Sequence, residues 1–211
     1  MKRSVFMVLA FCFMVSISNA QQETLFGNGK ITHGGYGGPE LKVTQFNDDW
    51  GLAFGGRGGW IINSAFSIGG GGYGIVTKHT VDYDYSKDPN ADIRLNVGYG
   101  GLFLEYINSS NRVVHFTVNA LIGAGGASYG VYDEDDRWDN YDDIKESSPF
   151  FVLEPGITAE VNVFKFFRIS AGVSYRWASG AELFNTDGTL LTDDNDISGM
   201  SANICFKFGS F

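Results

Sequence analysis

The sequence predicts an all-β protein, and more narrowly a closed antiparallel eight-stranded transmembrane β-barrel. Beyond residue 20 no apolar run approaches the roughly 18 residues of a spanning helix, so any bilayer crossing must use strands. Eight segments alternate apolar with small or polar residues, which is the period of a strand with two different faces. Apart from the brief turn near residues 47–49, the connections between them are alternately short and long, the arrangement expected of a transmembrane barrel.

The first 20 residues have the features of a secretory signal peptide. Lys2 and Arg3 precede an apolar run, and Ser18-Asn19-Ala20 supplies the small residues of a cleavage site. We expect residues 1–20 to be removed, residues 21–32 to form a periplasmic lead-in, and residues 33–211 to form the barrel. Cys205 is then the one cysteine left, so the mature chain has no intramolecular disulfide.

Five alternating segments occupy the first part of the barrel. We expect strands at about 33–47, 50–62, 65–76, 93–106 and 112–129. In the fourth segment the apolar phase changes between Tyr99 and Leu102. We therefore predict a β-bulge near Gly100 and Gly101.

The clearest alternation lies in residues 149–177, which we interpret as a hairpin, and an eighth strand follows at 196–211. Even-numbered residues share the polar face of both hairpin strands, so directly paired positions must sum to an even number. A three-residue loop at 164–166 pairs Val163 with Phe167 and sets Glu154 opposite Arg176. We predict a salt bridge between these two side chains, with the alternative that both face water in a wide lumen.

The apolar faces are assigned to lipid, because the lumen of an eight-stranded barrel barely holds side chains. The small and polar faces then point inward, and their charges must pair with one another because they are buried. This places an interior charge network at Arg57, Glu105, Glu154, Glu160, Arg168, Arg176 and Lys207. Aromatic residues near the strand ends form two interfacial girdles, with Trp50, Phe151 and Trp177 at one end and Trp60, Phe66, Tyr106, Phe167 and Phe208 at the other.

These features resemble those of small outer-membrane β-barrels of the OmpA, OmpX and OmpW type from Gram-negative bacteria. The resemblance rests on the signal peptide, the glycine and aromatic alternation, the hairpin VLEPGITAEVNVFKFFRISAGVSYR and the ending SGMSANICFKFGSF. It implies an outer-membrane location, short periplasmic turns, longer extracellular loops, contact with membrane lipid and lipopolysaccharide, and recognition of the C-terminal strand by the barrel-assembly machinery. The terminal Phe211 departs from the pattern, because it is out of phase with Phe206 and Phe208 unless a bulge lies at Gly209 and Ser210.

Acidic residues are concentrated in the predicted extracellular loops. The three long connections, with Asp196 at the end of the last, carry 17 of the 24 acidic residues. The run Asp133, Glu134, Asp135 and Asp136 is a possible site for a divalent cation, since carboxylates are hard oxygen ligands. The alternative is that these charges keep the loops soluble. The mature chain has 13 basic and 24 acidic residues, a net charge of −11, so we expect no nucleic-acid partner.

We expect a non-enzymatic, monomeric barrel without a cofactor, acting structurally or through its outer loops. One alternative is an outer-membrane enzyme that modifies lipid, for which the lumen-facing His115 is the best candidate residue. An ordinary interior hydrogen-bonding role is the favoured interpretation of this histidine. Another alternative is a narrow channel or carrier for small molecules, although eight strands normally leave no continuous water path.

Overall fold

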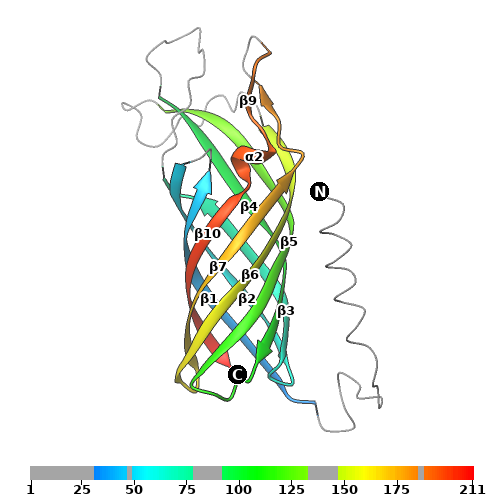
Figure 1. Ribbon diagram of the computed structural model, residues 1–211, viewed down its shortest axis with the longest axis vertical. Coiled ribbons are helices and arrows are strands. Elements are labelled where there is room, and N and C mark those ends of the chain that lie inside the picture. Colours follow the sequence, from blue (N-terminus) through cyan, green and yellow to red (C-terminus); the bar gives the residue numbers. More distant parts are fainter. Residues whose placement is uncertain (1–30, 47–48, 78–91, 133–146, 185–187) are drawn as a thin grey trace, which may run out of the picture. The chain divides into compact units, whose positions relative to one another are not determined.

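The computed structural model describes residues 31–46, 49–77, 92–132, 147–184 and 188–211. They form a closed antiparallel barrel of eight strands in the order β1-β10-β7-β6-β5-β4-β3-β2 (Figure 1). The predicted fold class is therefore confirmed. The barrel strands are β1 His33–Phe46, β2 Asp49–Ile62, β3 Phe66–Ile75, β4 Asp92–Asn108, β5 Val114–Tyr132, β6 Ser147–Phe164, β7 Phe167–Ser179 and β10 Gly199–Ser210. The expected signal peptide, and residues 21–30 of the expected lead-in, lie outside the described residues.

The connection from β7 to β10 contains additional structure. It includes a two-stranded sheet of β8 Leu183–Phe184 and β9 Leu190–Thr192, followed by the short helix α2 Asp194–Ile197. No helix in the described part of the chain is long and apolar enough to cross a membrane.

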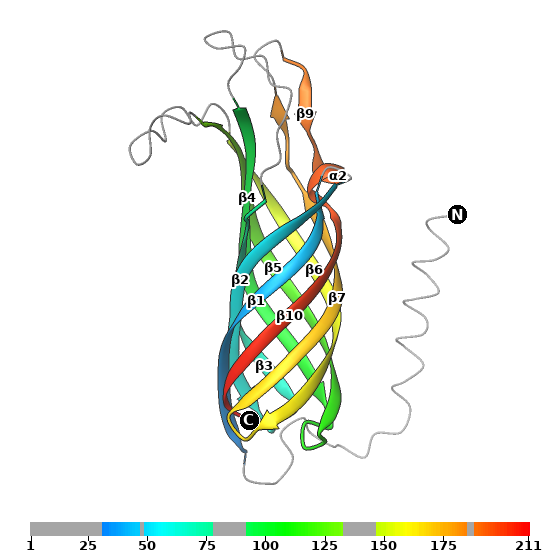
Figure 2. The same cartoon turned by 90° about the vertical axis from the view of Figure 1, so that its left-hand side faces the viewer.

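The two ends of the barrel differ in their connections. Residues 63–65, 109–113 and 165–166 form short turns at one end, where the C-terminus also lies (Figure 2). The connections at the other end are residues 47–48, 76–91, 133–146 and 180–198. Because outer-membrane barrels have short periplasmic turns and longer extracellular loops, we call these the periplasmic and outer ends.

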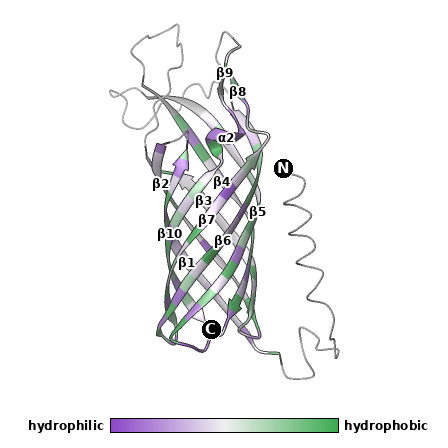
Figure 3. Cartoon of the chain, viewed as in Figure 1, coloured by the Kyte–Doolittle hydropathy of each residue, from purple (hydrophilic) through white to green (hydrophobic). Residues whose placement is uncertain are grey.

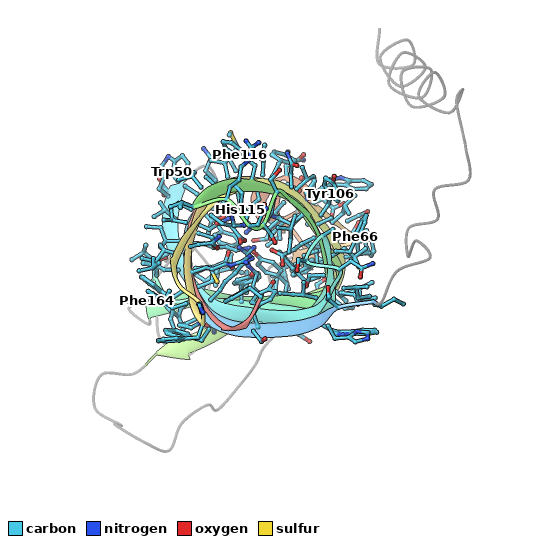
Figure 4. All side chains as sticks on the ribbon, turned by 90° about the horizontal axis from the view of Figure 1, so that it is seen from below. Trp50, Phe66, Tyr106, His115, Phe116 and Phe164 are labelled. Carbon is cyan, nitrogen blue, oxygen red and sulfur yellow. The ribbon has the colours of Figure 1, made fainter. Side chains whose placement is uncertain are left out.

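Residues alternate between the lumen and the outer surface along every barrel strand. Apolar and polar residues are accordingly interleaved along the strands (Figure 3). Viewed from the periplasmic end, His115 points into the ring, whereas Trp50, Phe116 and Phe164 lie outside it (Figure 4). The outward aromatic side chains are largely exposed, among them Trp50, Phe151 and Trp177 near the outer end and Trp60, Tyr106 and Phe208 near the periplasmic end.

The bulge predicted at Gly100 and Gly101 is wrong. β4 pairs in unbroken register with both β3 and β5, and Leu95, Val97 and Tyr99 point into the lumen. The apolar phase changes along β4 because the outer half of the lumen is itself apolar. The expectation that apolar faces point only at lipid therefore fails in that half. The apolar cluster that occupies this half, and that extends inward as far as Phe103 beside Arg57, contains Phe46, Tyr73, Leu95, Val97, Tyr99, Phe103, Leu121, Ala127, Phe150, Val152, Ala178, Ala181, Leu183 and Ile197.

The β6–β7 hairpin has the predicted register through most of its length, as the pair Gly156 and Ser174 shows. Its loop differs from the prediction. Phe164 pairs with Phe167, and the register shifts by one residue after Asn162, so the turn consists of residues 165 and 166 alone. β10 pairs regularly with β1 as far as Ser210, so the proposed bulge at Gly209 and Ser210 is absent.

Two adjacent glycines of β1 differ in the space available for a side chain. A Cβ at the inward-facing Gly38 would lie 1.9 Å from the carbonyl oxygen of Phe206, whereas a Cβ at the outward-facing Gly37 would meet nothing within 4 Å. We expect Gly38→Ala to lower the free energy of unfolding by about 1–3 kcal/mol, because backbone must move to admit the methyl group. Gly37→Ala is the matched control. Urea unfolding in lipid vesicles measures both, and equal stability of the two variants would contradict the packing described.

Candidate functional site: the charged barrel interior

All seven residues of the proposed interior charge network are buried in the lumen, with side chains from five strands. They are Arg57, Glu105, Glu154, Glu160, Arg168, Arg176 and Lys207. The structure adds Glu40 and Lys42 from β1, which are not in the predicted network. The signal was present, because both alternate with the lipid-facing Leu41 and Val43. Among the side chains that the structure describes, five cations and four carboxylates are therefore enclosed, together with His115.

The central network consists of Glu40, Lys42, Arg57 and Glu154. Lys42 Nζ donates to Glu154 Oε1 at 2.7 Å and lies 3.5 Å from the centre of the Tyr73 ring. Arg57 Nε lies 3.1 Å from Glu40 Oε2, without the alignment of a hydrogen bond, and the Tyr73 hydroxyl donates to the same oxygen at 3.1 Å. Each carboxylate thus faces a cation from another strand, and both ion pairs are nearly inaccessible to solvent.

The periplasmic network consists of Glu105, His115, Glu160, Arg168 and Lys207. Lys207 lies between two carboxylates, donating to Glu105 at 2.8 Å and also to Glu160. The second oxygen of Glu160 lies 3.2 Å from His115 Nε2 and 3.6 Å from Arg168 Nη1. His115 therefore faces the lumen, as predicted, and its partners are members of an ion network.

The predicted salt bridge between Glu154 and Arg176 is wrong, although the register that suggested it is present. Arg176 donates to the carbonyl oxygens of Ile197 and Gln45, each at 2.7 Å, and lies 3.9 Å from the Phe46 ring. Glu154 instead pairs with Lys42 across the lumen. In a barrel this narrow the opposite wall competes with the neighbouring strand for each charged side chain.

The outer mouth of the lumen is filled by the connection between β7 and β10. Ala181, Leu183 and Ile197 belong to the apolar core of the outer half, and Ile197 is fully buried. We call these three residues the outer plug. Arg176 ties the plug to the wall through the Ile197 carbonyl, and Asp194 Oδ1 accepts from the Ala181 amide at 2.7 Å.

Asp193 caps α2 and orders the end of this connection. Its side chain accepts the backbone N–H of Asn195 at 2.7 Å and that of Asp196 at 3.3 Å. The hydrogen bond from the Asn195 amide is the main reason that the pKa of Asp193 lies below its ordinary value of 3.8.

The periplasmic mouth is filled by the last residue of the chain. Phe211 packs against a cluster of Tyr36, Ile61 and Ile107, and its ring stacks on Tyr36 with centroids 6.3 Å apart. The Arg168 guanidinium lies 3.9 Å from the centre of the Phe211 ring. The terminal aromatic residue therefore packs at the lumen mouth, whereas Phe206 and Phe208 are exposed on the outer surface.

The proposed cation-binding residues Asp133, Glu134, Asp135 and Asp136 lie outside the described residues. Within the described ranges, no group of three or more histidine, cysteine, aspartate or glutamate side chains could hold a metal ion.

Comparison with solved structures gives the fold its context. A major outer membrane protein from Thermus thermophilus has a TM-score of 0.50 at 9% identity, with 82% of this chain and 98% of that chain covered. This is the fold of the outer-membrane β-barrels. The barrel also resembles Neisserial surface protein A (TM-score 0.46, 13% identity, 86% and 99% covered) and Ail of Yersinia pestis (0.45, 14%, 84% and 97%). No protein-family model and no curated protein sequence matches the chain. The described barrel therefore has the fold of the small outer-membrane β-barrels.

The central network predicts a specific coupling between Lys42 and Glu154. We expect Lys42→Met and Glu154→Gln each to lower the free energy of unfolding by about 3–5 kcal/mol, because each leaves a buried charge unpaired. The double variant should lose less than the sum, with a coupling of about 1–3 kcal/mol in urea unfolding. The control is the double-mutant cycle of Arg176→Met and Glu154→Gln. An equally large coupling free energy between Arg176 and Glu154 would contradict the assignment of Lys42 as the partner of Glu154.

The cap of α2 predicts a pH dependence in acid. Because the pKa of Asp193 is lowered by folding, its stabilising contribution is complete above pH 3.8 and is lost as the pH falls through the lowered value. The protection factor of the Asn195 amide, which is its intrinsic exchange rate divided by the observed rate at the same pH, should therefore fall in acid. Asp193→Asn retains a capping side chain that does not titrate, so its protection should stay constant over the same range. Identical pH profiles for the two proteins would exclude Asp193 as the cause.

Proposed function

We propose that this protein is a non-enzymatic outer-membrane barrel that acts structurally or through the surface it presents outside the cell. The observation that carries the proposal is that side chains fill the lumen at four levels. The outer plug lies in the apolar half, the central and periplasmic networks follow, and Phe211 lies at the opposite mouth. The charges of the interior are thus accounted for by closing the barrel.

The filled lumen is evidence against a channel or carrier function. A solute passing through the lumen would have to displace the outer plug and then separate ion pairs such as Lys42 with Glu154 and Lys207 with Glu160. Removing one partner of a buried ion pair costs about 3–5 kcal/mol. Each network therefore raises the barrier to transport independently of the other.

The contacts of His115 are evidence against its acting as a catalytic residue of a lipid-modifying enzyme. Its Nε2 faces Glu160 and Arg168, and its Nδ1 lies 3.3 Å from the carbonyl oxygen of Arg112. Both ring nitrogens are thus directed at groups that hold the barrel together. A general base must instead lie within hydrogen-bonding reach of the proton that it removes from a substrate or nucleophile.

The surface role places the partners outside the lumen. The lipid-facing side chains contact outer-membrane lipid, and the outer end contacts lipopolysaccharide. The barrel-assembly machinery reads the C-terminal strand, on which Phe206 and Phe208 face outward. The acidic connections, including the run from Asp133 to Asp136, supply hard oxygen ligands for divalent cations that bridge to anionic lipopolysaccharide. The barrel acts as a monomer.

Planar-bilayer recording tests the closed lumen. We expect the purified protein to produce no discrete conductance steps. A variant in which Leu183 and Ile197 are both replaced by serine should also remain closed, because the central and periplasmic networks still fill the lumen. Regular single-channel openings of the unaltered protein would overturn the proposal. Openings seen in the serine variant alone would place the whole barrier in the outer plug and contradict the role given to the networks.

A further inference from the structure

Exposed charges of opposite sign lie at opposite ends of the described barrel. The basic side chains whose burial is described are either inside the lumen or at Arg112 and Lys165, which are exposed in two periplasmic turns. Among the residues whose burial is described, the solvent-accessible acidic side chains are those of Asp49, Glu182, Asp193, Asp194 and Asp196. All five lie at the outer end. The acidic residues of the periplasmic half, Glu105 and Glu160, are buried in the lumen. Among the described residues, the exposed charged side chains of the periplasmic rim are therefore all basic.

The two basic turns are held side by side. Asn162, near the end of β6, donates its backbone N–H to the Val113 carbonyl, 2.8 Å away. Its side-chain amide donates to the carbonyl oxygens of Ser110 and Arg112 at 2.9 and 2.7 Å. The turn that carries Arg112 is thereby fastened to the strand that ends just before Lys165. Neither Arg112 nor Lys165 forms an ion pair with a described residue, so both charges are available to a partner.

Large apolar side chains surround these charges and point outward. Phe164 and Phe166 flank Lys165, stack on each other with centroids 5.8 Å apart, and are 61% and 60% exposed. Val113, next to Arg112, is 68% exposed. A free anion such as phosphate would neutralise the charges and leave this apolar surface in water. A partner that covers both must have an anionic group attached to an apolar body.

We propose that Arg112, Val113, Phe164, Lys165 and Phe166 form a binding surface for anionic phospholipid in the periplasmic leaflet of the membrane. The two basic side chains bind the lipid phosphate and its anionic headgroup, and the aromatic and valine side chains lie against the adjoining glycerol and acyl chains. Outer-membrane barrels have girdles of aromatic side chains at this interfacial depth. The surface selects lipids by net headgroup charge, so phosphatidylglycerol binds in preference to the zwitterionic phosphatidylethanolamine.

Native mass spectrometry of the mature protein in detergent tests the selectivity, with phosphatidylglycerol and phosphatidylethanolamine as equimolar probes. We expect the unaltered protein to retain phosphatidylglycerol preferentially. Arg112→Gln with Lys165→Gln should reduce that preference by about 25-fold, because each basic residue favours an anionic membrane surface by about five-fold. Arg112→Lys with Lys165→Arg keeps both charges and should keep the preference. Phe164→Ser with Phe166→Ser should weaken binding of both lipids.

Two controls separate loss of lipid binding from loss of folding and from simple anion binding. The altered mobility of unboiled protein on a detergent gel shows that each variant is folded, and the replaced side chains are all exposed. Inorganic phosphate should not displace the bound lipid, and displacement at equal concentration would show a simple anion site and overturn the proposal. Equal retention of the two lipids by the unaltered protein would also overturn it. So would an unchanged preference in the double glutamine variant.

Discussion

The narrow lumen of an eight-stranded barrel is the constraint on which the rest of this structure depends. Side chains from opposite walls meet inside it, so each inward-facing charge must find a counter-charge or a set of carbonyl oxygens without help from bulk water. Lys42 and Glu154 meet in this way from different strands, and Lys207 joins Glu105 to Glu160. Arg176 takes the other solution, because carbonyl oxygens and the Phe46 ring surround it.

The alternation of faces could be predicted from sequence because it is local. In β6 and β7 the neighbours one and two positions away indicate whether a residue faces the lumen or the outer surface. The rule that paired positions sum to an even number followed from those faces alone. Ion-pair partners could not be predicted in the same way. Glu154 and Lys42 are 112 residues apart, and their meeting depends on the diameter of the closed barrel. A single hairpin contains no information on that diameter.

Two further differences arise from treating the barrel as uniform along its axis. The outer half of the lumen is apolar, so Leu95 and Val97 point inward where a lipid-facing assignment was expected. At the opposite mouth Phe211 packs with Tyr36, Ile61 and Ile107. Both differences occur near the ends of the barrel, where inward side chains must close the mouth of the lumen as well as pack against its wall. An apolar residue in the inward phase near a strand end is thus a signal for closure, and it requires no bulge.

The position of Phe211 also matters to anyone who would label or immobilise this protein. Its ring lies under Arg168 and against Tyr36, so the chain finishes at the lumen mouth. An affinity tag joined to the last residue would start beside that packed ring, and its first residues would compete with the ring for the same space. Gly188, exposed between β8 and β9 with open space around it, offers an attachment point away from the Phe211 ring.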